Sequence, residues 1–302
     1  MSEERTCTSS FVADGNGSSK GWKIVPIPGK ELGVIAEVEY ETGDLIISEK
    51  PLFTCNIDTS IETLTKEIQD CVARLNDDDK KKFHSLSDCH EDSGNPATEL
   101  GIFQTNSHPC GFNYSAKKSG ILPVICRINH SCCPNATHSW NEQRGEQMIY
   151  AAKPIAIGEE ILITYRDNFG KASERIKELE SFWNFCCNCP ACLEGKCTSA
   201  EFTTRDKRRQ QIKKLDTLIY NAISKGSYDL GINFVKKRLD LLKEEGEDTP
   251  KNRMKSEYDA YQACTYKGDE SAKKEWLRKA LRDALLAYGP DYQEKFKQEL
   301  GS

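Results

Sequence analysis

The sequence lacks any long run of apolar residues, and this absence excludes a membrane-spanning helix. Its apolar stretches are short, as in the segment from Gly120 to Cys126, whereas a span needs about 20 apolar residues in succession. The first residues also lack a basic start followed by an apolar core, so we expect no secretory signal peptide. Aromatic residues make up 9% of the chain, which excludes a wholly disordered protein.

An excess of positive charge is also lacking. The 302 residues include 42 Lys and Arg against 47 Asp and Glu, which gives a formal net charge of −5. Residues 1–200 hold 20 basic and 29 acidic residues, whereas residues 201–302 hold 22 and 18. Binding to nucleic-acid phosphates needs clustered cations, so we expect no direct nucleic-acid binding. The acidic first part suits a basic peptide as ligand instead.

Cysteine, in contrast, is abundant, with 14 residues in the chain. Without a signal peptide we expect reduced thiols or metal ligands, not a disulfide framework. Cys187, Cys189 and Cys192 are two and three residues apart, so their thiolates can face one tetrahedral Zn²⁺. The dense spacing and the turn residues Asn188 and Pro190 favour a zinc site over a group of merely buried thiols.

Three close cysteines leave one vertex of the zinc tetrahedron for a distant residue. The best upstream candidates are Cys132 and Cys133, and Cys186 and Cys197 compete for a ligand role. The spacing alone does not decide among these four thiols.

The pattern of apolar and turn residues predicts a mixed fold. Residues 1–20, rich in Ser, Gly and Glu, predict a mobile leader. Short β-rich runs separated by turn residues predict strands at 22–27, 33–38, 44–48, 121–125, 147–151 and 160–165. Apolar residues three and four apart predict a helix over 60–86, followed by a turn-rich stretch over 87–118. Further helices are expected at 173–182, 205–224, 228–245, 253–267 and 270–288.

The helices beyond residue 200 are joined by short connections. This arrangement is typical of stacked helix hairpins, as in helical repeats. Their apolar positions predict a core of their own. The basic run from Arg205 to Arg209 predicts a solvated helix start, with a localisation or nucleic-acid role as the alternative.

Several motifs follow one another in a fixed order. They are Asn129-His-Ser-Cys-Cys-Pro-Asn135, Gly158-Glu-Glu-Ile-Leu-Ile-Thr-Tyr165 and Cys187-x-Cys189-x-x-Cys192. Together they resemble a SET-domain protein lysine methyltransferase with its post-SET zinc knot. Residues 30–36 and 43–52 are similar to the opening strands of that family, and Thr105-Asn-Ser107 is similar to the segment before the second half of the fold. The resemblance spans about residues 22–197.

The chain looks like the SMYD branch of this family. The similarity rests on Trp183-x-Phe185-x-Cys187 before the zinc knot, on the helical insert and on the helical C-terminal region. That branch usually carries a MYND zinc finger. No Cys-x-x-Cys pair occurs between Cys55 and Cys110, so we expect no MYND finger here, as in fungal-type SET proteins.

The resemblance implies an α+β fold with four parts. The expected parts are a flexible leader (1–20), a SET domain of short β-strands (21–170) with a helical insert at about 57–105, a post-SET zinc region (171–197) and an all-α, helical-repeat-like C-terminal domain (198–302). The C-terminal helices would cover the peptide groove or bind a partner.

The resemblance also implies an activity. The chain would be an S-adenosylmethionine-dependent protein lysine N-methyltransferase that acts on a lysine of a histone tail or of another basic protein. Its cofactors would be S-adenosylmethionine and one structural Zn²⁺. We expect an intracellular monomer without membrane association, in the nucleus, the cytoplasm or both.

Site residues follow from the resemblance by motif position. The catalytic residue would be Tyr165. Cofactor contacts would come from the backbone around Lys30 and Leu32, and from Asn106, Asn129, His130 and Phe185, with Phe185 stacked on the adenine. The substrate channel would be lined by Trp183, Tyr165 and Cys126. The zinc ligands would be Cys132, Cys187, Cys189 and Cys192, with Cys133 as the alternative to Cys132.

One residue departs from the family pattern. Glu31 stands where the family commonly has the first glycine of its opening Gly-x-Gly motif, of which Gly33 is the second. A side chain there would reshape cofactor binding, or the turn is shifted and uses Gly29 instead. The alternative function is therefore a catalytically silent SET-like zinc protein that binds peptides or protein partners.

Overall fold

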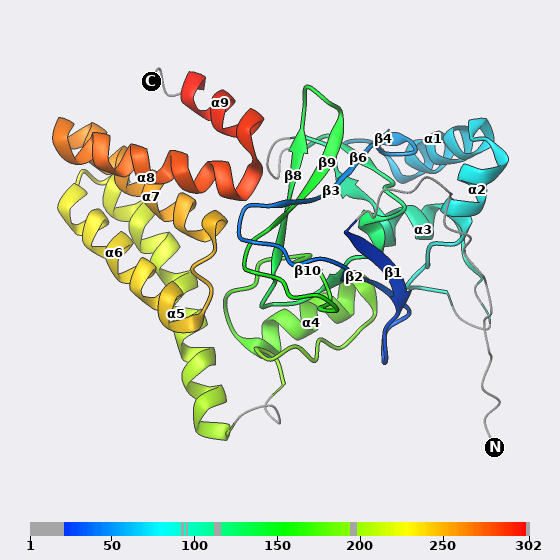
Figure 1. Cartoon of the computed structure of the whole chain (residues 1–302), viewed down its shortest axis with the longest axis horizontal. Helices are drawn as coiled ribbons and strands as arrows, with labels where there is room; N and C mark the ends of the chain where they lie inside the picture. The colour runs from blue at the N-terminus through cyan, green and yellow to red at the C-terminus, as the bar shows by residue number, and fades with distance from the viewer. Residues whose placement is uncertain (1–20, 92–93, 95, 112–115, 194–197, 300–302) are drawn as a thin grey trace.

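The computed structural model describes residues 21–91, 94, 96–111, 116–193 and 198–299. Short strands occupy the middle of the molecule, the helices of residues 61–106 lie on one side of them, and the long helices of residues 199–299 lie on the other (Figure 1). The expected leader 1–20 and the candidate ligand Cys197 fall outside the described residues.

The strands form several small sheets. β1 (Trp22–Pro26) pairs antiparallel with β2 (Leu32–Ala36). One three-stranded sheet has the order β3 (Leu45–Glu49), β9 (Glu146–Ala151), β8 (Ala136–Asn141), and another has the order β4 (Thr54–Asn56), β6 (Lys118–Gly120), β5 (His108–Pro109). β7 (Asn129–His130) and β10 (Leu162–Ile163) form a parallel pair. β1, β2, β3, β9 and β10 lie where the sequence predicts strands, whereas β4 to β8 were not predicted.

The insert is helical, as expected for residues 60–86. It contains α1 (Ile61–Arg74) and α2 (Asp77–His84), whose first turns are capped by the side chains of Ser60 and Asn76. α3 (Glu99–Asn106) lies in the stretch expected to be turn-rich. This helix has only eight residues, too few for its apolar residues to show a helical period in the sequence.

The strand expected at residues 121–125 is wrong. Pro123 has no N–H to donate to a neighbouring strand, and the chain turns there into the 3₁₀ helix η2 (Ile125–Arg127). The Glu49 carboxylate accepts the N–H groups of Val124 (3.0 Å) and Ile125 (2.9 Å), which a strand would have paired. Ile121, Leu122 and Ile125 are fully buried, so their hydrophobicity reflects burial and not strand pairing.

The second half of the chain is helical. It holds α4 (Ala172–Trp183), α5 (Ser199–Ser224), α6 (Tyr228–Glu245), α7 (Pro250–Lys267), α8 (Glu270–Tyr288) and α9 (Pro290–Glu299). α6 and α8 have the predicted bounds. α9 was not expected, because Pro290 was interpreted only as a break, although proline is favoured at the first helical position. Among the described residues, no helix is long and apolar enough to cross a membrane.

The C-terminal helices pack against the sheet that contains β8 and β9. Asn141 in β8 donates from Nδ2 to Asp291 Oδ2 in α9 at 2.6 Å, and Arg144 lies 3.4 Å from the same carboxylate. Between α8 and α9, a β-carbon on Gly289 would lie 2.0 Å from Tyr150 Oη of β9. This contact therefore requires glycine, and it fixes the helical region against the strands.

The basic run in α5 is not a solvated helix start. Arg209 is fully buried, and the side chains of Arg205 and Arg208 are only 28% and 20% exposed. All three guanidinium groups bind Glu245, at the end of α6. The expectation fails because these cations pair with a buried carboxylate that the sequence places about 40 residues away.

Candidate active site and metal centre

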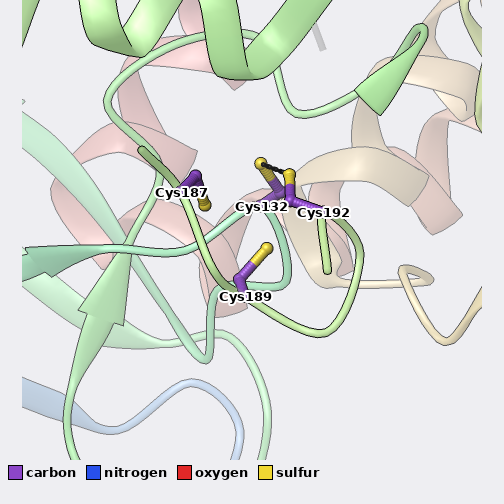
Figure 2. A group of neighbouring side chains, drawn as sticks. All are labelled: Cys132, Cys187, Cys189 and Cys192. Carbon is purple, nitrogen blue, oxygen red and sulfur yellow. Dashed lines mark hydrogen bonds between the residues drawn. The ribbon is translucent and has the colours of Figure 1, made fainter. Parts of the chain in front are cut away.

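Four cysteines gather at one point between the strands and the helices. The Sγ atoms of Cys132, Cys187, Cys189 and Cys192 all lie within 4.8 Å of one another, and all four residues are buried. Figure 2 shows the four side chains with their sulfur atoms near one another. The Sγ atoms of Cys132 and Cys192 lie 3.5 Å apart. Cys132 follows β7, whereas the other three lie between α4 and α5.

This donor set fits a tetrahedral zinc ion. Zn–S bonds of about 2.3 Å place the sulfurs of a tetrahedron about 3.8 Å apart, close to the spacing of these thiols. The second half of the site is shaped by a turn in which the N–H groups of Cys192 and Leu193 donate to the Cys189 carbonyl at 2.9 and 3.1 Å. The four cysteines could therefore hold one Zn²⁺ as Cys₄, and they are the residues that the resemblance implies.

The tertiary structure distinguishes Cys132 from the other candidate zinc ligands. The Cys133 thiol lies 3.2 Å from Arg209 Nη2 and 3.8 Å from Arg205 Nη2, outside the group of four. Cys186 is exposed. The Cys133 thiol also hydrogen-bonds with that of Cys189, but it is not one of the four whose Sγ atoms all lie within 4.8 Å of one another.

His130 connects the metal centre with the expected catalytic residue. Its Nδ1 accepts the backbone N–H of Tyr165 at 3.0 Å, so in the neutral ring the proton is on Nε2. Nε2 lies 3.4 Å from Cys132 Sγ, which it can reach as a donor. Burial lowers the pKa of His130 to about 4, so the ring is neutral near pH 7.

Tyr165 is surrounded by aromatic rings. Its ring centroid lies 5.3 Å from those of Trp183 and His130, and 6.4 Å from that of Phe185, which it meets edge-on. Its hydroxyl donates to the Ile128 carbonyl at 2.8 Å. Burial raises the pKa of the Tyr165 hydroxyl well above its ordinary value, so the group is neutral.

The end of α4 brings the aromatic residues to this position. Asn184 adopts a left-handed conformation that ends the helix, with its N–H bonded to the Glu180 carbonyl at 2.9 Å. The Trp183 indole donates to the Thr105 carbonyl at 3.1 Å, which ties α4 to α3. The ring centroid of Phe185 lies 6.1 Å from that of His130, and Phe185 also packs against the cluster that contains the four cysteines.

Cys126 belongs to the same region. Its thiol donates to the Asn106 carbonyl at 3.0 Å. Burial raises its pKa to about 12, so it is a neutral thiol. Cys126 and Tyr165 both pack against the core that contains Ile125 and Ile128, and Trp183 adjoins Tyr165 through their ring contact.

The parallel pair of β7 and β10 places Asn129 beside the first hairpin. Its Nδ2 donates to the Leu32 carbonyl at 2.9 Å and to Glu160 Oε1 at 2.8 Å. Lys30 Nζ binds the same carboxylate at 2.7 and 2.9 Å. These bonds bring together three residues expected to contact the cofactor, Lys30, Leu32 and Asn129. They do not use the side-chain oxygen of Asn129, Oδ1, which can face a ligand.

Asn106 lies at the end of α3, and its side chain is partly committed. Its two amide hydrogens go to the carbonyls of Ser87 and Ile102, each at 2.7 Å. Of the side chain, the amide oxygen is left for a ligand. The structure links it to the site through Cys126, which donates to its backbone carbonyl.

The glycine that this site requires is Gly33. A β-carbon there would lie 2.8 Å from Asn129 Nδ2 and 2.9 Å from Glu160 Oε1. Glu31, in contrast, is exposed and its carboxylate accepts a hydrogen bond from Ser87. The turn before β2 uses Gly29, at φ +75°, with the Lys30 N–H bonded to the Ile27 carbonyl at 3.0 Å. The shifted turn is therefore the one the structure contains.

Two further residues organise the site without having been assigned a role from the sequence. Glu160 holds both Lys30 and Asn129, as described above. Asn135 donates from Nδ2 to Glu159 Oε1 and to the Glu160 carbonyl, both at 2.9 Å, and accepts the Leu162 N–H at 2.8 Å. Asn135 and Glu160 lie within the motifs Asn129–Asn135 and Gly158–Tyr165, so the sequence marks them as part of the site. It does not reveal which residues they bind.

Comparison with known proteins agrees with this geometry. Residues 31–166 match the family model described as SET domain. The chain is 32% identical over 195 residues to histone-lysine N-methyltransferase set5 of Schizosaccharomyces pombe. This match covers 65% of this chain and 57% of that protein. The chain is 29% identical over 178 residues to N-lysine methyltransferase SMYD2 of Gallus gallus, covering 56% and 36%. The matches thus span less than two thirds of these relatives.

A solved structure of Rubisco LSMT bound to sinefungin and monomethyllysine is also similar. The match covers 94% of this chain and 93% of that one, with 12% sequence identity and a TM-score of 0.37. A score this low carries no argument about this chain.

Proposed function

We propose that the chain is an S-adenosylmethionine-dependent protein lysine N-methyltransferase. The observation that carries this proposal is a neutral tyrosine, Tyr165, enclosed by Trp183, Phe185 and His130 and adjoining the segment that holds Asn129. The SET-domain match and the names of the relatives support it.

The proposed reaction places three demands on the protein, of which the first concerns the lysine amine. When bound, S-adenosylmethionine would supply a methyl group on a sulfonium centre. The amine that attacks it must be neutral, although its ordinary pKa is about 10.4. The aromatic walls around Tyr165 disfavour the ammonium form because they exclude water. The same walls would hold the alkyl stem of the lysine.

The second demand is alignment of the amine with the methyl group. Positioning of two reactants can contribute several kcal/mol to the lowering of a barrier. Tyr165 is fixed by its hydroxyl bond to the Ile128 carbonyl and by its N–H bond to His130. Trp183 is fixed by its indole bond to the Thr105 carbonyl. We propose that these two side chains and Cys126 line the lysine channel.

The third demand is stabilisation of the partly positive methyl group. The Tyr165 oxygen and nearby backbone carbonyls can accept weak C–H···O contacts from it. The raised pKa of Tyr165 leaves its hydroxyl protonated, and this role needs no charge on it. Tyr165 is therefore proposed as the catalytic residue that orients the methyl group and not as a general base.

We propose that the cofactor lies along the first hairpin and β7. Asn129 and Asn106 would accept hydrogen bonds with their amide oxygens, because their amide hydrogens are already used. The backbone near Lys30 and Leu32, together with His130, would approach the cofactor, and Phe185 would stack on its adenine. One structural Zn²⁺ held by the four cysteines would join the loop after β7 to the segment after α4.

We also propose the coarser features of the protein. Its division would be a leader (1–20), a SET domain (21–170) with an insert, a zinc region (171–197) and a helical domain (198–302). The substrate would be a lysine of a histone tail or another basic protein, met in the nucleus or cytoplasm. We propose a monomer that does not bind nucleic acid directly, which size-exclusion chromatography and a DNA-binding titration would test.

The decisive experiment is transfer of radiolabelled methyl groups to histones and to whole-cell extract. The wild-type chain should label at least one protein, and Tyr165→Phe should label it far more slowly while binding the cofactor with the same affinity in calorimetry. Cofactor binding without transfer to any protein would favour the alternative of a silent peptide-binding SET protein. A chain that neither transfers methyl groups nor binds the cofactor would overturn the proposal.

A further inference from the structure

A buried arginine joins the helical region to the loop that carries the first zinc ligand. Arg209 of α5 is fully buried. Its Nη1 donates to the backbone carbonyl of Cys132 at 2.9 Å and to that of Asn168 at 2.7 Å. Its Nη2 reaches the Cys133 thiol at 3.2 Å. One side chain therefore holds the doubled-cysteine loop at two places.

Carboxylates fix the orientation of this guanidinium. Nε of Arg209 donates to Glu245 Oε1 at 2.8 Å, and Nη2 lies 3.5 Å from Glu247 Oε1. Glu247 is itself bound by Lys153 at 3.0 Å. The planar, forked guanidinium makes these contacts in several directions at once, which a lysine ammonium on a flexible stem would not reproduce.

A second side chain, that of Asn168, also binds this loop. Asn168 Nδ2 donates to the Cys132 carbonyl at 3.2 Å, beside the bond from Arg209. Both donors act on the backbone of the residue whose Sγ faces the other three thiols and lies 3.4 Å from His130 Nε2. A shift of this backbone would displace the thiol and the histidine contact together.

The charges around the loop complement a zinc–thiolate centre. Four thiolates and one Zn²⁺ carry a net negative charge. On the side of α5, the fully buried Arg209 guanidinium lies 3.2 Å from the Cys133 thiol, and the Arg205 guanidinium lies 3.8 Å from the same thiol.

We propose that Arg209 is a positioning residue of the metal centre, so that helix α5 contributes a residue to the site. By holding the Cys132 carbonyl, it fixes the thiol that binds zinc and the contact of that thiol with His130. The consequence for cofactor binding rests on the proposed methyltransferase function, whereas the consequence for the metal does not.

The test compares zinc release from the full-length chain to a chromophoric chelator. Outer contacts of metal ligands contribute about 10- to 100-fold to affinity, so Arg209→Lys should release zinc about tenfold faster or more and should shift the visible spectrum of the Co²⁺-substituted protein. Arg208→Met is the matched control, because Arg208 lies on the same helix and binds Glu244 and Glu245. It should release zinc at the wild-type rate.

If Arg209→Lys does not fold, Asn168→Ala decides the question, because it removes the second donor to the Cys132 carbonyl and should also accelerate release. Wild-type release rates in the folded variant would overturn the proposal, as would an equal acceleration by Arg208→Met. Calorimetry with S-adenosylmethionine separates the two hypotheses: faster zinc release in Arg209→Lys supports the role of Arg209 even if the wild-type chain binds no cofactor.

Discussion

Replacing Gly33 with alanine tests whether β2 must approach Asn129 as closely as it does. A β-carbon there would lie 2.6 Å from Ile27 Cγ1, 2.8 Å from Asn129 Nδ2 and 2.9 Å from Glu160 Oε1. These atoms belong to three separate segments, so no single side-chain rotation makes room. Overpacking of this kind costs about 1–3 kcal/mol, and we expect the free energy of unfolding to fall by about 2 kcal/mol.

The same substitution should weaken cofactor binding. The Asn129 amide would have to leave its bonds with the Leu32 carbonyl and Glu160, each of which contributes about 1 kcal/mol. Misplacing this side chain should therefore raise the dissociation constant for S-adenosylmethionine about tenfold, which corresponds to about 1.4 kcal/mol. Urea unfolding followed by tryptophan fluorescence measures the first effect, and titration calorimetry measures the second.

Glu31→Gly is the matched control for this prediction. Glu31 is exposed, two residues away, so its removal should leave the cofactor affinity unchanged. Wild-type stability and affinity in Gly33→Ala would refute the close-approach argument. Much tighter binding by Glu31→Gly would show that the departure from the family pattern, and not the contact at Gly33, limits cofactor binding.

Three further predictions concern the metal, the tyrosine and pH. Elemental analysis should find one zinc per chain. The Cys189→Ser variant should lose this zinc and the Cys133→Ser variant should keep it, because the Cys133 thiol lies against arginines. Loss of zinc from both variants would place Cys133 among the ligands. Tyr165→Phe should lower the free energy of unfolding in urea by about 1 kcal/mol, since a carbonyl loses its hydroxyl donor; a more stable variant would contradict this. Burial lowers the pKa of His108 to about 4 and that of His138 to about 3, so the unfolded chain takes up protons first as the pH falls below 6.5. Stability should therefore decrease between pH 7 and pH 4, by on the order of 1–2 kcal/mol for each histidine at about pH 5, and the loss should be smaller in a His108→Gln, His138→Gln double variant.

The sequence was sufficient where a local pattern had one structural outcome. The helices at 228–245 and 270–288 have the predicted bounds, because capping residues and glycines mark both ends. The segment at 121–125 failed because apolar residues signal burial and not the conformation in which they are buried. α9 was missed because a proline that ends one helix can also begin the next.

The sequence by itself determined the motifs, their order and three of the four clustered thiols, because these depend on residue type and short spacing. Only the tertiary structure decided that Cys132 and not Cys133 completes the group, because that choice depends on which thiol the fold brings close to all three of the others. It also decided that Gly33 is the glycine that must stay small, and that Arg209 is buried and not solvated. Each of these facts depends on partners far away in the chain, which no local pattern of residues records.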